Sequence, residues 1–208
     1  VADLDHGAAR MLNLPPLKSD GVNFTRLLGQ DGHAVDDAFL ARRRDALLDA
    51  TREFSPQCLI TELFPFGRRI LRAEFRALLD AMRLQTPRPI MLASVRDILA
   101  PPSRPQKATQ TDQIIAEFYD AVLVHSDPDG TRLENSWPVS PELAVKLRYT
   151  GYIAPPPASQ HPDATGADEV LVSAGGGSVG TALFECARAA AGMMPDRRWR
   201  LLVGGTDT

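Results

Sequence analysis

The sequence predicts an α/β fold with parallel sheets in two domains, and three observations lead to this prediction. Short apolar runs alternate with segments that carry apolar residues at the helical period of 3.6. Each apolar run is nearly continuous, which is typical of parallel strands. A proline-rich stretch interrupts the alternation, which then starts again with an apolar run and a glycine-rich turn.

The first domain accounts for most of the elements. Strands are predicted, in chain order, at residues 11–14, 58–61, 90–95 and 121–124. Asp36 or Asp37 is suited to cap a helix that ends at Ser55 and Pro56. Apolar stripes predict two further helices, at about residues 71–82 and 114–119. Strands joined through helices are expected to run parallel, with right-handed crossovers.

A proline-rich, polar stretch at residues 155–166 separates the two predicted domains. Residues 1–154 form the first domain and residues 167–208 the start of the second. The second domain is expected to contain a strand at 170–174, a helix at 179–191 and a strand at 199–203. We expect both domains to be truncated, because parallel strands need cover on both faces and no helix follows the last strand.

Composition limits the possible functions. The chain is 44% apolar and 24% charged with a net charge of −3, so no basic footprint for nucleic acid is expected. No apolar run reaches the roughly 18 residues of a membrane span. Cys58 and Cys186 lie in apolar stretches and are predicted to be buried free thiols, as in a cytoplasmic protein. His6, His33 and His161 have no partners at metal-ligand spacing, so no metal site is predicted.

The glycine-rich turn is the strongest local signal. Gly175, Gly176, Gly177 and Ser178 lie between a predicted strand and a predicted helix. Glycines allow a close backbone approach, and the N–H groups of a helix start attract anions, so a phosphate or diphosphate is the expected ligand. No lysine follows the glycines, which argues against an ordinary ATPase or GTPase. The alternative is a tight turn without a ligand.

Polar residues follow the predicted strands of the first domain, at the edge where open parallel sheets bind ligands. They are Glu62 after the strand at 58–61, Arg96 and Asp97 after 90–95, and His125 and Asp127 after 121–124. Glu62, Asp97 and His125 are candidate catalytic bases, and Arg96 could offset charge on a ligand. The alternatives are structural: Glu62 in solvent, Asp97 paired with Arg96, and Asp127 capping a turn.

Five ordered segments resemble those of predicted bacterial glycosyltransferases, relatives of the N-acetylglucosaminyltransferase that completes the lipid-linked peptidoglycan precursor. The segments are LPPLK at 14–18, FPFG at 64–67, RDIL at 96–99, YDAVLV at 119–124 and YTGY at 149–152. The resemblance covers about residues 12–205. It implies a GT-B architecture, with two Rossmann-like domains that face each other across a cleft.

In such a family the second domain mainly holds the nucleotide-sugar donor, and the first holds the acceptor. Gly175, Gly176, Gly177 and Ser178 match the turn near the donor diphosphate. The resemblance implies inverting transfer of a sugar, most simply from a uridine diphosphate donor, to an unknown hydroxyl, without a cofactor. A lipid-linked acceptor would bring peripheral membrane contact.

The chain also departs from the family pattern. The family's first glycine-rich loop and the donor helix with its ribose-binding acid have no counterpart in these residues. The catalytic base is therefore unassigned, and the 208-residue chain is expected to be inactive by itself.

Other functions remain open at this point. Gly175-x-Gly177-x-x-Gly180 also satisfies a dinucleotide fingerprint, but the acid expected about 20 residues later is missing. A nucleotide-sugar epimerase or hydrolase, and a non-catalytic sugar-binding module, are compatible with the same scaffold, because a fold does not determine a function.

Overall fold

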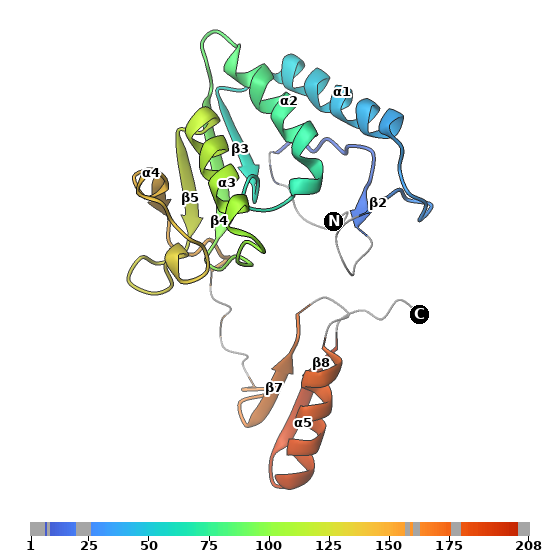
Figure 1. Ribbon diagram of the computed structural model, residues 1–208. Helices are drawn as coiled ribbons and strands as arrows, with labels where there is room; N and C mark the ends of the chain where they lie inside the picture. Colours follow the sequence, from blue (N-terminus) through green and yellow to red (C-terminus); the bar gives the residue numbers. More distant parts are fainter. Residues whose placement is uncertain are drawn as a thin grey trace. The chain divides into compact units, whose positions relative to one another are not determined.

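The computed structural model describes residues 7, 9–19, 26–156, 159, 163–175 and 180–203. It divides the chain into two compact units, which we call unit 1 (Val1–Ala154) and unit 2 (Pro155–Thr208). Figure 1 shows the elements of both units. That unit 2 is the start of a nucleotide-sugar-binding domain stays a prediction.

Unit 1 is built on a four-stranded parallel sheet with the strand order β3-β4-β5-β6. The strands are β3 (Cys58–Glu62), β4 (Ile90–Arg96), β5 (Ala121–His125) and β6 (Leu147–Tyr149). Helices connect consecutive strands, so the arrangement is Rossmann-like and the predicted α/β class with a parallel sheet is confirmed for this unit. The strand β6 was not predicted from the sequence, because it is only three residues long and contains the charged Arg148.

The helices of unit 1 are α1 (Asp37–Phe54), α2 (Arg72–Arg83), α3 (Pro105–Phe118) and α4 (Pro141–Ala144), with short 3₁₀ helices η1 (Arg69–Leu71) and η2 (Leu133–Asn135). Asp36 caps α1, because its side chain accepts the N–H of Phe39 at 2.7 Å. The helix ends at Ser55, which adopts the left-handed conformation before Pro56. Both ends of this helix were predicted from the sequence.

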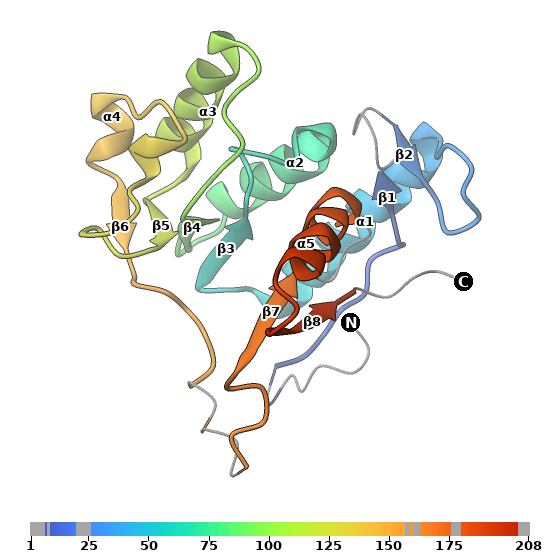
Figure 2. The same cartoon turned by 90° about the horizontal axis from the view of Figure 1, so that it is seen from below.

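The core lies between the sheet and these helices. Figure 2 shows α2, α3 and α4 on one side of the sheet. The side chains that face this layer from the two central strands are at most 1% exposed, namely Met91, Ala93, Val95, Val122 and Val124. They pack in one cluster with Leu79, Met82, Ile115 and Phe118 from the helices. The predicted apolar stripes of both helices are thus confirmed.

The opposite face of this sheet is much less buried. Ile60 and Ile90 are each 55% exposed, and Leu92 and Leu123 are half-buried. The topology explains the difference. The chain moves across the sheet in one direction from β3 to β6, and right-handed crossovers then place every connecting helix on the same face.

Unit 2 contains a parallel pair of strands, β7 (Glu169–Ser173) and β8 (Arg198–Leu202), joined through α5 (Thr181–Met193). The predicted strand, helix and strand are therefore present in order. A short antiparallel pair, β1 (Lys18–Ser19) and β2 (Leu27–Leu28), precedes α1 in unit 1.

Two predictions were wrong. Residues 11–14 form no strand; Met11 and Leu12 are 55% and 61% exposed and have no partner strand in the described chain. Cys58 and Cys186 are both exposed rather than buried. Cys58 lies on the open face of the sheet in register with Ile90, and Cys186 lies on an exposed side of α5, so an apolar neighbourhood in the sequence did not mean burial.

Candidate functional site

The predicted polar residues of unit 1 lie at the carboxyl edge of the parallel sheet. Glu62, Arg96 and His125 are the last residues of β3, β4 and β5. Asp97 follows β4 directly, and Asp127 comes two residues after the end of β5. Arg96 is in register with His125, so both side chains project from the same, open face. Parallel strands therefore bring these residues to a single edge of one sheet.

His125 is the best-positioned polar group at this edge. Its Nε2 atom lies 2.8 Å from Ser94 Oγ, and its Nδ1 atom lies 2.8 Å from Thr150 Oγ1. Ser94 comes from the neighbouring strand β4, two residues before Arg96, and is only 9% exposed. Thr150 follows β6, and its N–H extends the ladder by donating to Val124 O at 3.0 Å. Three neighbouring strands thus hold the imidazole between two hydroxyls.

Sequence reasoning missed Ser94 and Thr150, although a signal for Ser94 was present. A strand places residues i and i+2 on one face, so Ser94 had to share the face of Arg96. Thr150 gave a weaker signal, because the strand that it follows was not predicted.

Glu62 is separate from the group around His125. Its carboxylate accepts the Nε–H of Arg68 at 3.0 Å, and both side chains are about half-exposed. An exposed carboxylate paired with a guanidinium is a common feature of protein surfaces. The structure favours Glu62 as a surface ion-pair partner.

The two aspartates are engaged in local turns. Asp97 Oδ1 accepts the N–H of Ile98 at 2.9 Å, and Asp127 Oδ1 accepts the N–H of Asp129 at 2.9 Å. Asp127 therefore has the turn-capping role that was the structural alternative. Asp97 forms no ion pair with Arg96 among the described residues, and the exposed guanidinium of Arg96 has no hydrogen bond or ion pair there.

The loops at the carboxyl edge pack against one another. Phe66, after β3, meets the ring of Trp137, after β5, edge to face at 5.2 Å between the ring centroids. The N–H of Leu99, after β4, donates to Ser136 Oγ at 3.0 Å. These contacts give the site a rigid support, because each loop is fixed by another.

Only part of the glycine-rich turn can be described. Gly175 has φ +79°, and a Cβ added there would meet nothing within 4 Å. Gly176, Gly177 and Ser178 lie outside the described residues. Gly180, directly before α5, allows close packing, because an added Cβ would lie 2.5 Å from Phe184 Cε2 and 2.6 Å from Ala174 Cβ.

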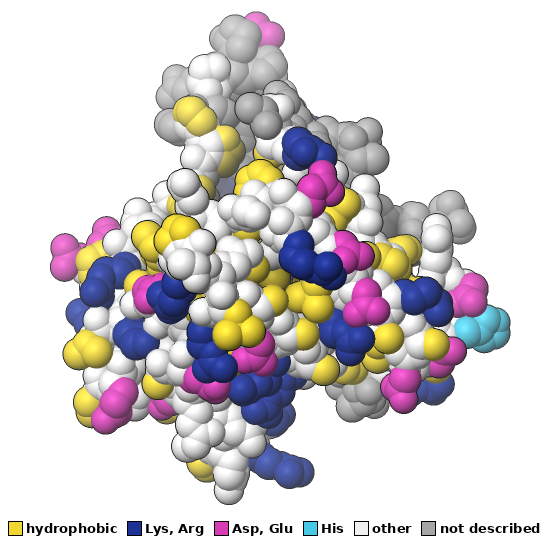
Figure 3. Space-filling model, turned by 90° about the horizontal axis from the view of Figure 1, so that it is seen from above, with side chains coloured by type: hydrophobic (Ala, Val, Ile, Leu, Met, Phe, Trp, Pro, Cys, Tyr) yellow, Lys and Arg dark blue, Asp and Glu magenta, His cyan; other side chains and the backbone are white. Residues whose placement is uncertain are grey.

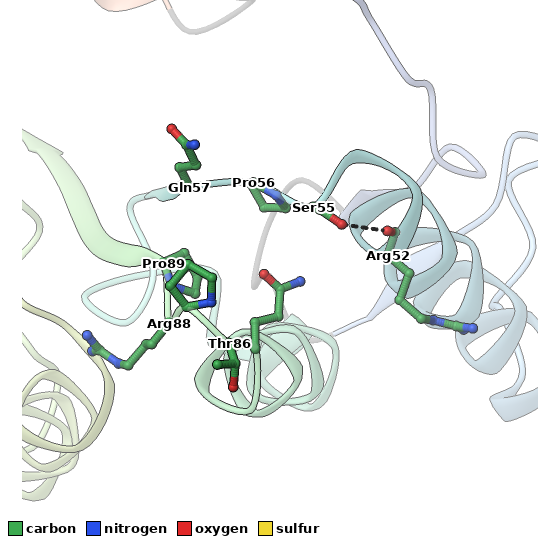
Figure 4. Close-up of a pocket in the computed structure, with 9 residues that line it drawn as sticks. Arg52, Ser55, Pro56, Gln57, Thr86, Arg88 and Pro89 are labelled. Carbon is green, nitrogen blue, oxygen red and sulfur yellow. Dashed lines mark hydrogen bonds between the residues drawn. The ribbon is translucent and has the colours of Figure 1, made fainter.

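Two large cavities among the described residues lie away from this edge, and the larger, of about 650 Å³, is lined by Met11, Leu12 and Phe54 among others. A cavity of about 600 Å³ lies near the amino ends of β3 and β4, where Pro56, Pro87 and Pro89 line it (Figure 4). Its Arg88 is paired with Asp120 at 3.0 Å, and Ser55 donates to Arg52 O at 3.0 Å. Its lining contains no Asp, Glu, His or Cys, so we do not place the chemistry there.

Charge and metal-binding groups give no further site. Basic and acidic side chains are interspersed over the face shown in Figure 3 and form no patch of one sign. Across the part of the chain that the structure describes, no three His, Cys, Asp or Glu side chains gather as they would around a metal ion. None of the described helices is long and apolar enough to cross a membrane.

Comparison of the chain with protein-family models, with curated proteins and with solved structures found no match.

Proposed function

We propose that this chain belongs to a glycosyltransferase that moves a sugar from a nucleoside diphosphate to an acceptor hydroxyl. One observation carries the proposal. Three of the five segments that resemble the glycosyltransferase family lie at the carboxyl edge: 64–67 follows β3, 96–99 begins at the end of β4, and 149–152 begins at the end of β6. The segment 119–124 contains most of β5, which ends at His125.

Unit 1 supplies the acceptor side in this proposal, with His125 as the general base. The reaction needs a group that accepts the proton of the attacking hydroxyl, and a histidine can do so near neutral pH. His125 is half-buried and held by two hydroxyls, whereas Glu62, Asp97 and Asp127 each bind a nearby guanidinium or backbone N–H. Arg96 projects from the same face as His125 and would offset negative charge on the donor.

Unit 2 supplies the start of the donor side. Gly175, Gly176, Gly177 and Ser178 would bind the diphosphate through backbone N–H groups, with uridine as the expected base of the nucleotide. The described part of the turn is compatible with this role, because Gly175 has positive φ and open space around it.

The first test is binding of uridine diphosphate by calorimetry. Gly176→Val should weaken binding by about tenfold or more, which is about 1.4 kcal/mol, because a branched Cβ would occupy the approach to the diphosphate. His33→Ala, at an exposed position of unit 1, is the matched control and should leave binding unchanged. Equal affinity of a folded Gly176→Val variant and the parent would argue against a diphosphate site at this turn.

The second test is product analysis with uridine diphosphate sugars. The 208-residue chain should form no glycosylated product at a useful rate. A chain extended through a complete second domain should form it, and His125→Gln should reduce kcat by about 100-fold or more. Release of free sugar would instead indicate a hydrolase, and a changed sugar configuration would indicate an epimerase. Either result would replace the transferase proposal.

A further inference from the structure

The contacts of His125 allow a tautomer in which Nε2 is the base. Thr150 Oγ1 lies 3.0 Å from Gly151 O and 3.4 Å from Val124 O, and its single hydroxyl proton can go to either carbonyl. In that arrangement Thr150 Oγ1 accepts the Nδ1–H of His125 at 2.8 Å. The lone pair of the neutral imidazole is then on Nε2, where it accepts the hydroxyl proton of Ser94 at 2.8 Å.

From this geometry we propose that Ser94 is an activated nucleophile, with His125 as its base and Thr150 as the residue that orients the base. A nucleophile within hydrogen-bond reach of a base that a third group orients is the general arrangement of covalent catalysis by serine. The substrate class is an ester or another acyl or phosphonyl electrophile. This activity would use His125 and Arg96, as the proposed sugar transfer does, but it requires no nucleotide.

The surroundings of Ser94 fit this role. Ser94 lies within strand β4, so its position is rigid, and it projects from the open face of the sheet beside Arg96 and His125. The Arg96 guanidinium has no hydrogen bond or ion pair within the described ranges and can offset negative charge that develops on an attacked oxygen. Other charged groups at or near this edge are Glu62, Arg68, Asp97, Asp127, Asp129, Arg132, Glu134 and Arg148.

Ser126 provides an internal contrast. It is next to His125 in the sequence, but it is fully buried and its hydroxyl donates to Thr131 O at 2.6 Å. A hydroxyl that donates to a carbonyl has no base to remove its proton. Ser55 is an exposed serine of the same kind, since its hydroxyl donates to Arg52 O at 3.0 Å.

The chemical step can be written with a fluorophosphonate, a general probe of activated serines. Ser94 Oγ attacks phosphorus, an O–P bond forms, and the P–F bond breaks with release of fluoride. The hydroxyl proton passes to His125 Nε2 and then to water. With a carboxylic ester, the same attack would give an acyl-serine and an alcohol, which receives its proton from His125, and water would then release the acid.

The test is to incubate the 208-residue chain with a fluorophosphonate and locate the phosphonyl group by peptide mass spectrometry. We expect modification at Ser94, while Ser55 and Ser126 stay unmodified. His125→Gln should slow the modification by about 100-fold or more, because the base is lost. Thr150→Val, which has the same shape but no acceptor, should slow it by about tenfold, and Thr150→Ser should restore most of the rate.

Two controls keep the result specific. Ser126→Ala should be modified at Ser94 at the rate of the parent chain, and circular dichroism should show that every variant is folded. The proposal is wrong if the unaltered chain is not modified at Ser94, or if Ser55 reacts as fast. Unchanged modification of Ser94 in a folded His125→Gln variant would also overturn it. None of these outcomes bears on uridine diphosphate binding at the glycine-rich turn, so failure of this proposal and failure of the proposed donor site are distinguishable.

Discussion

The two units contain the same local pattern, a strand, a helix and a parallel strand, but they bury their side chains to very different extents. In unit 1, Met91, Val122 and Phe118 are at most 1% exposed. In the described part of unit 2, Leu171 is 60% exposed and Leu202 is 48% exposed. The difference shows that an apolar run indicates a strand, whereas burial of its side chains also requires neighbouring strands and a layer of helices over the face to which they point.

Large-to-small substitutions test this difference in burial. Phe118→Ala should destabilise unit 1 by about 3–5 kcal/mol, because it removes a buried ring and leaves a cavity. Leu171→Ala should change the stability of unit 2 by no more than about 0.5 kcal/mol, because most of that side chain is already in water.

The chain has two tryptophans, Trp137 in unit 1 and Trp199 in unit 2, so each unit can be followed by its own fluorescence. Denaturant unfolding would follow Trp137 in a Trp199→Phe background, and Trp199 in a Trp137→Phe background. Similar costs of Phe118→Ala and Leu171→Ala would mean that unit 2 has a core of the same quality as unit 1.

The next largest effect on stability is expected at Gly180 of unit 2, where neighbouring side chains pack tightly. Gly180→Ala would place a Cβ 2.5 Å from Phe184 Cε2 and 2.6 Å from Ala174 Cβ, so neighbouring groups must move. We expect a loss of about 1–3 kcal/mol in unit 2, measured through Trp199. Gly192→Ala is the matched control, because a Cβ there meets nothing within 4 Å. A cost at Gly192 equal to that at Gly180 would contradict the packing explanation.

The sequence predicted where the helices and strands of both units lie better than it predicted how buried their side chains are. The helix at 37–54 was recognisable at both ends, because Asp36 and Ser55–Pro56 act through local backbone geometry. The exposure of Cys58 was not, because it depends on which face of the sheet the helices cover. The same limit applies to the site. His125 was identified as a strand-end residue, but its partners Ser94 and Thr150 come from β4 and from the end of β6, so only the register brings them together.

A smaller effect on stability is expected from the buried hydrogen bond between Tyr119 and Thr61 in unit 1. Tyr119 is 2% exposed, and burial raises the pKa of its hydroxyl. Thr61 Oγ1 donates to Phe64 O at 3.1 Å and therefore accepts from the Tyr119 hydroxyl at 2.6 Å. Tyr119→Phe removes that bond but leaves no buried donor unpaired, so it should cost about 1 kcal/mol.

Thr61→Val is the complementary change. It deprives the buried Tyr119 hydroxyl of its acceptor, and an unpaired buried donor costs about 1–3 kcal/mol. Urea unfolding followed at Trp137 would measure both variants. A larger loss in Tyr119→Phe than in Thr61→Val would reverse the assigned direction of the hydrogen bond.

The smallest effect that we expect is a dependence of the stability of unit 1 on pH, which comes from the carboxylate of Asp120. Desolvation by itself raises the pKa of Asp120, but the N–H of Met91 at 2.8 Å and the cations of Arg88 and Lys146 together hold that pKa below its usual value of 3.8. A lowered pKa in the folded state means that Asp120 contributes stability above about pH 4, and that this contribution is lost as the pH falls through the folded-state pKa. Because the side chain is 40% exposed, solvent screening limits the contribution to less than about 1 kcal/mol. Asp120→Asn should therefore lower the urea midpoint of unit 1 at pH 7 and have little effect at pH 2, where the parent chain has lost the same ionic contacts. If the two proteins differ as much at pH 2 as at pH 7, Asp120 acts through its shape or its neutral hydrogen bonds and not through its charge.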